Sequence, residues 1–215
     1  MRPRLLLALT FTVATLAAGI WYGLLRSERS APVAAVVPLP QIGGDFRLTT
    51  HQGREVSAAS FQGKWLLVYF GFTHCPVICP TTIARIGAAL DRLGPLADDF
   101  QPLFISVDPA RDTPAVLTEF LGAFDRRFLG LTGPPEQVAA AATAYRVYYG
   151  RASPAGPESI SHTDLVYVMD PEARFVAYFA GHEDADHMAA RLRGLLASRS
   201  NPDGLARRNK AGGPR

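Results

Sequence analysis

The stretch KWLLVYFGFTHCPVICPTT, residues 64–82, decides the fold because it joins a buried strand, a loop and the start of a helix. Residues 64–72 form an almost continuous apolar run of β-forming side chains, which is typical of a central strand buried on both faces. The two cysteines and two prolines follow, and we expect a helix from about Thr81 to Leu93. The cysteines then lie at the carboxyl end of a buried strand, where α/β sheets form binding crevices.

On both sides of this stretch the sequence continues with strand and helix patterns. Residues 45–57, DFRLTTHQGREVS, alternate apolar and polar residues around a turn and predict a short β-hairpin. Downstream we expect strands at 102–108, 128–131, 164–170 and 174–180, and helices at 114–124, 135–148 and 185–197. Alternation that ends in a hairpin and a helix predicts an α/β sandwich with a mixed sheet.

The amino-terminal part predicts a membrane anchor. Residues 5–25 contain no charged side chain, and a run of this length can span a bilayer. A cleavable signal peptide is the rival interpretation, but no convincing cleavage site of small residues precedes Arg26. We therefore expect an uncleaved anchor with short flanks in residues 1–29, with Trp21 and Tyr22 near its outer interface.

The remaining organisation follows from composition. Residues 30–43 begin with a Pro- and Ala-rich, uncharged stretch that predicts an extended linker, and residues 44–198 form the expected domain. Residues 199–215 have almost nothing apolar to bury and predict a disordered basic tail. Residues 30–198 carry 13 basic and 17 acidic side chains, although the whole chain has a net charge of +3. The domain is therefore mildly acidic, and the positive net charge gives no reason to expect nucleic-acid binding.

Cys75 and Cys79 are the only cysteines of the chain, and their spacing leaves three interpretations open. They form a structural disulfide, a redox-active dithiol or part of a metal site. Pro76 and Pro80 bias the cysteines that precede them away from helical backbone, which predicts a constrained loop with a helix beginning near Pro80. The amino terminus of that helix favours thiolate over thiol.

A metal site needs at least one more ligand, and the histidines are the candidates. They are His51, His74, His162, His182 and His187. His74 is interpreted as a solvent-facing or redox-tuning side chain, because adjacent residues in an extended segment point in opposite directions. We expect His51, His182 and His187 to lie at the surface, which is the usual place of a histidine.

His162 stands just before the strand expected at 164–170 and after a loop rich in Gly and Pro. The residues alone leave it open whether His162 is a ligand or an ordinary loop residue. Two thiolates with one imidazole would suit Cu(I), could also hold Cu(II), and could bind zinc with a fourth ligand.

Three motifs in order resemble the Sco/SenC family of copper-binding assembly proteins. They are GFTHCPVICPTT at 71–82, SVDPARDTP at 106–114 and SHTDLVYVMDPEARFVAYF at 161–179. The resemblance covers residues 38–198. It implies a thioredoxin-like, three-layer fold on a membrane anchor, with copper, Cu(I) or Cu(II), held by Cys75, Cys79 and His162.

The resemblance also implies a function and a set of partners. The expected function is a metallochaperone that assists maturation of the binuclear copper site of cytochrome c oxidase. The alternative is an enzyme, a thiol:disulfide oxidoreductase that keeps the copper-ligand cysteines of its target reduced. The expected partners are the copper-receiving subunit of the oxidase and other copper chaperones or thiol reductases. The expected location is a bacterial inner membrane, with a single span and the domain in the periplasm.

Two departures from the family pattern and two acidic residues complete the predictions. Ser161 stands where the family often has Asp, which would weaken copper binding or alter its redox balance, and Ala173 replaces a turn glycine. Asp108, at the end of a predicted strand, is a candidate for a place beside the copper, with a turn-forming role as its alternative. Asp112 or Thr113 can cap the helix that follows, and for Asp112 a cap is favoured over a role in the site.

Overall fold

The computed structural model describes residues 41–151 and 160–200, together with Trp21. Apart from Trp21, the expected anchor over 5–25 lies outside the described residues, as do most of the linker and residues 201–215 of the expected tail. Within the described part of the chain, no helix combines the length and the apolar character needed to cross a membrane.

A seven-stranded mixed sheet forms the centre of the domain. Its strands are β1 (Arg47–Thr50), β2 (Glu55–Ser57), β3 (Trp65–Gly71), β4 (Phe100–Ser106), β5 (Leu129–Thr132), β8 (Leu165–Met169) and β9 (Phe175–Ala180). They lie in the order β2-β1-β5-β4-β3-β8-β9. β3, β4 and β5 are parallel, and the remaining pairs are antiparallel. The mixed sheet predicted from the sequence is therefore confirmed.

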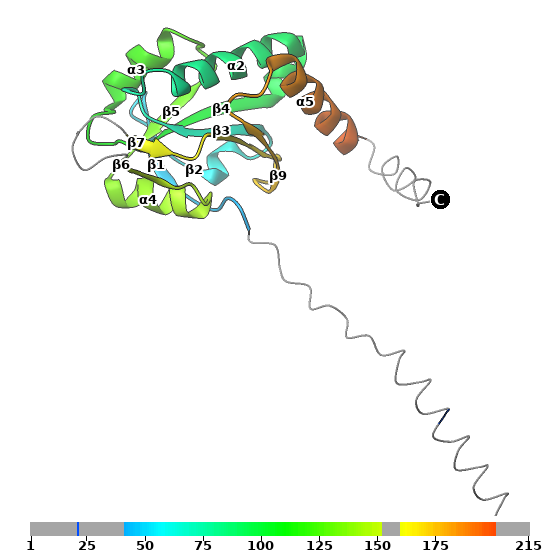
Figure 1. Cartoon of the computed structure of the whole chain (residues 1–215), viewed down its shortest axis with the longest axis horizontal. Helices are drawn as coiled ribbons and strands as arrows, with labels where there is room; N and C mark the ends of the chain where they lie inside the picture. Colours follow the sequence, from blue (N-terminus) through cyan, green and yellow to red (C-terminus); the bar gives the residue numbers. More distant parts are fainter. Residues whose placement is uncertain (1–20, 22–40, 152–159, 201–215) are drawn as a thin grey trace, which may run out of the picture. The chain divides into compact units, whose positions relative to one another are not determined.

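Helices cover both faces of this sheet. They are α2 (Ile78–Leu93), α3 (Pro114–Gly122), α4 (Pro135–Ala144) and α5 (Ala185–Ser200), with short 3₁₀ segments η1 (Ala58–Phe61) and η2 (Gly94–Asp99). Figure 1 shows α2, α3 and α5 along one face and α4 on the other. The result is a three-layer sandwich in which β3 is buried along its whole length.

Successive side chains of β3 point into opposite layers, as the strand geometry requires. Phe70 packs on Tyr145 at the end of α4, with ring centroids 5.4 Å apart. Tyr69 packs on Phe104 of β4, with centroids 6.2 Å apart. Because both faces of β3 are covered by apolar groups, the strand has no polar face, which explains its uninterrupted apolar run.

Two local predictions differ from the structure. α2 begins at Ile78, earlier than predicted, so Cys79 lies in the first turn of the helix instead of in the loop. Pro80 is tolerated there because the first turn of a helix contains backbone N–H groups that have no intrahelical partner. The segment expected to be a loop at 150–161 begins and ends in strands, β6 (Tyr149–Arg151) and β7 (Ile160–His162), which pair as a separate ribbon.

The parallel register of β3 and β4 determines where the functional loops meet. Gly71 pairs with Ser106, so both strands end at the same edge of the sheet. The loop that carries the cysteines leaves β3 at this edge, and the loop that carries Asp112 leaves β4 beside it.

Candidate metal centre

The two cysteines lie on the connection between β3 and α2. Cys75 is on the loop and Cys79 is one residue inside the helix, and both side chains are buried as free thiols. The backbone N–H of Cys79 donates a hydrogen bond to the sulfur of Cys75 at 3.4 Å. The turn of the loop thus brings the first sulfur over the start of the helix that carries the second.

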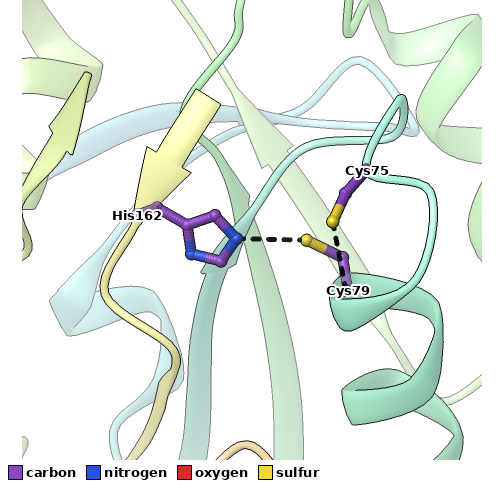
Figure 2. A group of neighbouring side chains, drawn as sticks. All are labelled: Cys75, Cys79 and His162. Carbon is purple, nitrogen blue, oxygen red and sulfur yellow. Dashed lines mark hydrogen bonds between the residues drawn. The ribbon is translucent and has the colours of Figure 1, made fainter. Parts of the chain in front are cut away.

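His162 completes the group from the opposite side (Figure 2). Its Nε2 lies 3.3 Å from the Sγ of Cys79. The two sulfurs and a ring nitrogen of His162 all lie within 4.8 Å of one another. Within the described residues, this is the one cluster of Cys, His, Asp or Glu with the spacing of a metal site.

The orientation of His162 is set by a hydrogen bond to the backbone. Its Nδ1 lies 3.1 Å from the carbonyl oxygen of Thr163, which can only accept a hydrogen bond. Nδ1 therefore carries the proton, and in the neutral ring Nε2 presents its lone pair toward Cys79. The rings of Tyr69 and Phe72 meet the imidazole edge-on, at centroid distances of 6.0 and 5.8 Å.

Asp112 anchors the cysteine loop, so the prediction that it caps a helix is wrong. The carboxylate is fully buried and accepts hydrogen bonds from the Ser106 hydroxyl at 2.6 Å and the Thr73 hydroxyl at 2.6 Å. The backbone N–H of Thr73 also donates to it, at 3.1 Å. Thr113 is the residue that caps α3, since its hydroxyl accepts from the N–H of Val116.

Glycine at position 71 allows the sulfur of Cys79 to approach the sheet. A Cβ added there would lie 2.8 Å from Cε2 of Phe104 and 3.0 Å from Sγ of Cys79. Real Cβ atoms do not sit this close to their neighbours, so any side chain would push one of them away. The first letter of the GFTHCP motif is therefore explained by packing beneath the site.

The sulfur of Cys79 is held as a thiol in the metal-free protein. Burial raises the pKa of Cys79 from 9.0 to about 12, and the hydrogen bond from the backbone of Phe72 offsets this only in part. The expectation that the helix amino terminus favours the thiolate is therefore wrong for this residue, because desolvation is the larger effect. A bound metal ion would reverse the balance, since coordination deprotonates a thiol.

An open cavity of about 570 Å³ lies beside Cys75. It is lined by Phe72, His74, Cys75, Pro76, Val77, Ile78, Arg111 and Ile160. Val77 and Ile78 are exposed, which leaves an apolar rim around the entrance. Cys79 and His162 do not line this cavity, so Cys75 is the member of the cluster that faces it.

The other sequence candidates lie away from the cluster. His74 is exposed and lies 3.0 Å from the Thr73 hydroxyl, which fits the predicted solvent-facing position. His182 and His187 are exposed, as predicted. His51 is half-buried instead, and its Nδ1 accepts from the N–H of Gly130 at 2.9 Å.

Asp108 pairs with Arg111 in the turn after β4, and its N–H donates to the hydroxyl of Ser106. This contact accounts for the predicted turn-forming role. Its predicted place beside a metal stays a prediction.

The donor set matches the chemistry of a soft metal ion. Two cysteine sulfurs and one imidazole nitrogen converge. Among the residues that the structure describes, no carboxylate belongs to this cluster. Thiolate ligands favour Cu(I), and imidazole also suits Cu(II). Structural zinc sites use four protein ligands, so three donors fit copper better than structural zinc.

The sequence profile of the SCO1/SenC family matches residues 36–197. The chain is 39% identical over 149 residues to the SCO1 homolog 1, mitochondrial, of Arabidopsis thaliana, over 68% of this chain and 45% of that protein. It is 44% identical over 140 residues to SenC of Rhodobacter capsulatus, over 65% of this chain and 63% of that protein. The chain thus spans about half the length of the first curated relatives that it matches.

A solved structure described as Bradyrhizobium japonicum ScoI with copper bound is also similar. It superposes with a TM-score of 0.66 at 42% identity, over 71% of this chain and 98% of that one. At this identity and coverage, the thioredoxin-like fold implied by the motifs is confirmed.

Proposed function

Because this chain belongs to the SCO1/SenC family, we propose that it is a copper carrier that holds the ion with Cys75, Cys79 and His162. The observation that carries the proposal is the convergence of the three ligand atoms within 4.8 Å. Copper is the cargo, delivered to a partner by exchange of these ligands. The copper bound to the related ScoI supports this choice of metal.

The geometry gives each ligand a role. Cys79 and His162 contact each other in the metal-free protein, so they form a prepared pair for the ion. Cys75 faces the open cavity and is the ligand that an incoming partner can reach first. The Nε2 of His162 faces Cys79 and can offer its lone pair to the ion, whereas both thiols lose their protons when copper binds.

Anaerobic titration of the reduced protein with Cu(I), in competition with a chromophoric chelator, tests the proposal. We expect one copper per chain, and greatly weakened binding for Cys75→Ala, Cys79→Ala and His162→Ala. His182→Ala is the matched control, because His182 is exposed and lies outside the cluster. Unchanged affinity in His162→Ala, with the fold intact by circular dichroism, would overturn the ligand assignment.

We further propose that the copper goes to the binuclear copper site of cytochrome c oxidase during its assembly. The proposed partners are the copper-receiving subunit of the oxidase, with other copper chaperones or thiol reductases acting on this protein. The copper-loaded domain should transfer its metal to the isolated copper-receiving domain, whose visible spectrum reports loading. Failure of transfer with reduced acceptor would reject this destination and leave the copper site itself in place.

The alternative function is thiol:disulfide reduction, favoured by the contact between the two cysteines. The sulfur of Cys75 accepts from the N–H of Cys79, and both thiols are free. In this reaction the Cys75 thiolate attacks a disulfide of the target and forms a mixed disulfide, releasing one target thiolate. Cys79 then loses its proton and displaces the second target sulfur, so the target gains two electrons and this protein ends as the Cys75–Cys79 disulfide.

A substitution of His162 distinguishes reductase activity from copper binding. His162→Ala should abolish tight copper binding and leave reduction of a target disulfide intact, because exchange uses sulfur alone. The measurement is the rate of thiol release from an oxidised copper-site peptide, with Cys75→Ser as the inactive control. A wild-type rate equal to that of Cys75→Ser would reject the alternative.

The proposed location is a bacterial inner membrane, with a single span at residues 5–25 and the domain in the periplasm. The charge-free run of this segment supports it. Proteolysis of intact spheroplasts should remove the domain from the outside, and alkaline extraction should leave the full-length chain in the membrane. Release of the chain by alkaline extraction would reject the anchor.

A further inference from the structure

A carboxylate lies beside the cluster that the ligand set does not use. Asp164 follows His162 by two residues, on the short connection between β7 and β8. Its Oδ1 accepts hydrogen bonds from the hydroxyl of Tyr69 at 3.1 Å and from the hydroxyl of Thr82 at 3.3 Å. Asp164 thereby ties the segment that carries the histidine to β3 and to α2.

Both hydrogen-bond donors are close to the ligands. Tyr69 is fully buried, and its ring contacts the imidazole of His162 edge-on. Thr82 lies three residues after Cys79 in α2, on the same side of the helix, and is also buried. Asp164 therefore connects one neighbour of the histidine with one neighbour of the second cysteine.

Gly181 lies against the carboxylate of Asp164. A Cβ at Gly181 would lie 1.9 Å from Oδ1 of Asp164, so a side chain there would displace the carboxylate from this place. The carbonyl oxygen of Gly181 accepts from the hydroxyl of Thr82 at 3.3 Å and from the guanidinium of Arg85 at 3.0 Å. The backbone N–H of Gly181 donates to the carbonyl oxygen of Asp164 at 3.1 Å.

We propose that Asp164 is a positioning residue that sets the place of His162 relative to Cys79. The segment from 162 to 164 leaves the small β6–β7 ribbon and enters the main sheet. The carboxylate fastens this segment to Tyr69 of β3 and to Thr82 of α2. Without the carboxylate, the imidazole keeps its hydrogen bond to Thr163. Its segment loses the link that holds the ring at a fixed place beside the sulfur of Cys79. The effect on copper rests on the proposed function, whereas the effect on the imidazole does not.

The first test is copper affinity in three variants of the full chain. Asp164→Ala should weaken Cu(I) binding about tenfold, the size of effect typical for groups that orient metal ligands. Asp164→Asn keeps an amide oxygen that can accept from both hydroxyls, and it should restore most of the affinity. Asp170→Ala is the control, because Asp170 is a buried carboxylate in the β8–β9 turn at the other end of β8.

These results distinguish positioning from general stability. The proposal is overturned if Asp164→Ala binds copper as wild type does, or if Asp170→Ala weakens binding equally at the same loss of thermal stability. It is also overturned if Asp164→Asn binds as weakly as Asp164→Ala.

The second test uses the copper-free protein, so it survives a failure of the copper proposal. Nitrogen-15 spectra of the imidazoles should show His162 of the wild type as one neutral tautomer with the proton on Nδ1. Asp164→Ala should keep this tautomer but show shifted or exchange-broadened His162 ring signals, because the ring is no longer held in one place beside Cys79, and Asp164→Asn and Asp170→Ala should resemble wild type. An unaltered His162 signal in Asp164→Ala would overturn the inference even if wild-type protein binds copper. If wild-type protein does not bind copper, the proposed function fails and this spectrum still decides the positioning role.

Discussion

The two sides of the candidate site are built differently. The cysteine side belongs to the main core: Cys79 and Asp112 are fully buried, and the loop between β3 and α2 lies on the parallel strands. The histidine side is a ribbon of two three-residue strands outside the main sheet, with Ser161 exposed and His162 half-buried. Isolated two-stranded ribbons are marginally stable on their own.

The difference shows which of the three ligands is held in place by the folded core and which is held by only a few hydrogen bonds. Folding of the domain already fixes the cysteines, because the buried carboxylate of Asp112 joins Thr73 of their loop to Ser106 at the end of β4. The histidine depends on a few hydrogen bonds of its own short segment, of which those of Thr163 and Asp164 are the main ones. Substitutions on the cysteine side should therefore lower stability, and those on the histidine side should lower metal affinity with stability nearly intact.

The largest expected effect is that of Asp112→Ala. The change leaves the hydroxyls of Ser106 and Thr73 and the N–H of Thr73 without their buried acceptor. We expect the free energy of unfolding of the copper-free protein to fall by about 4 kcal/mol, measured by urea denaturation. Asp112→Asn keeps part of the acceptor and should lose less. A loss below about 1 kcal/mol in Asp112→Ala would mean that the cysteine loop is not held by the core.

Gly71→Ala should lower stability by about 2 kcal/mol, because the new methyl group overpacks Phe104 and Cys79. It should also weaken copper binding, since the displaced atom is a ligand. Gly122→Ala is the control, because a Cβ there meets no atom within 4 Å. Equal unfolding midpoints for the two variants would contradict the close packing beneath the site.

The raised pKa of Cys79 predicts a loss of stability in alkali. The folded protein holds the thiol proton up to about pH 12, whereas the unfolded chain releases it near 9.0. The stabilising contribution is complete below pH 9 and is lost as the pH rises from 9 toward 12. At pH 10 the loss is about 1.4 kcal/mol. The free energy of unfolding of Cys79→Ala, measured by urea denaturation from pH 8 to pH 10, should lack this decrease. If wild type and Cys79→Ala lose stability in parallel, the raised pKa of Cys79 is rejected.

The smallest expected change in stability is on the histidine side, in Thr163→Val. The hydroxyl of Thr163 accepts from the N–H of Tyr148 at 3.0 Å, and its loss should cost about 1 kcal/mol. Copper affinity should nevertheless fall about tenfold, because the segment that carries His162 is loosened. Thr118→Val on α3 is the control, with a hydroxyl bonded to the carbonyl oxygen of Pro114. The contrast between the two sides fails if Thr163→Val changes stability and leaves affinity unchanged.

Much of the fold was predictable because its signals are local. The apolar run at 64–72 predicted a strand buried on both faces, and the Thr/Pro pair at 113–114 marks the start of α3. The cluster of Cys75, Cys79 and His162 was predictable only with the family resemblance. The residues alone left His162 undecided, since its position depends on contacts of its segment with β3 and α2, which are distant in the sequence.

The contacts that support the site were not predictable, because their partners are distant in sequence. Asp112 before Thr113 and Pro114 has the local pattern of a helix cap, and its partner Thr73 lies 39 residues earlier. Asp164 meets a tyrosine 95 residues away. The thiol state of Cys79 was mispredicted for a related reason: the helix terminus is visible in sequence, whereas the depth of burial is set by packing.

The turn between β8 and β9 offers a way to widen the range of variants that can be studied. Ala173 has a φ of 59°, a left-handed conformation that glycine adopts at lower cost. Its N–H donates to the carbonyl oxygen of Asp170, and the carboxylate of Asp170 accepts from the N–H groups of Glu172 and Arg174. These bonds hold the turn in place, so Ala173→Gly should relieve about 1 kcal/mol of strain while the turn keeps them. Such a protein would serve as a reinforced background in which the Asp112 and Gly71 substitutions fold well enough for their copper binding to be measured.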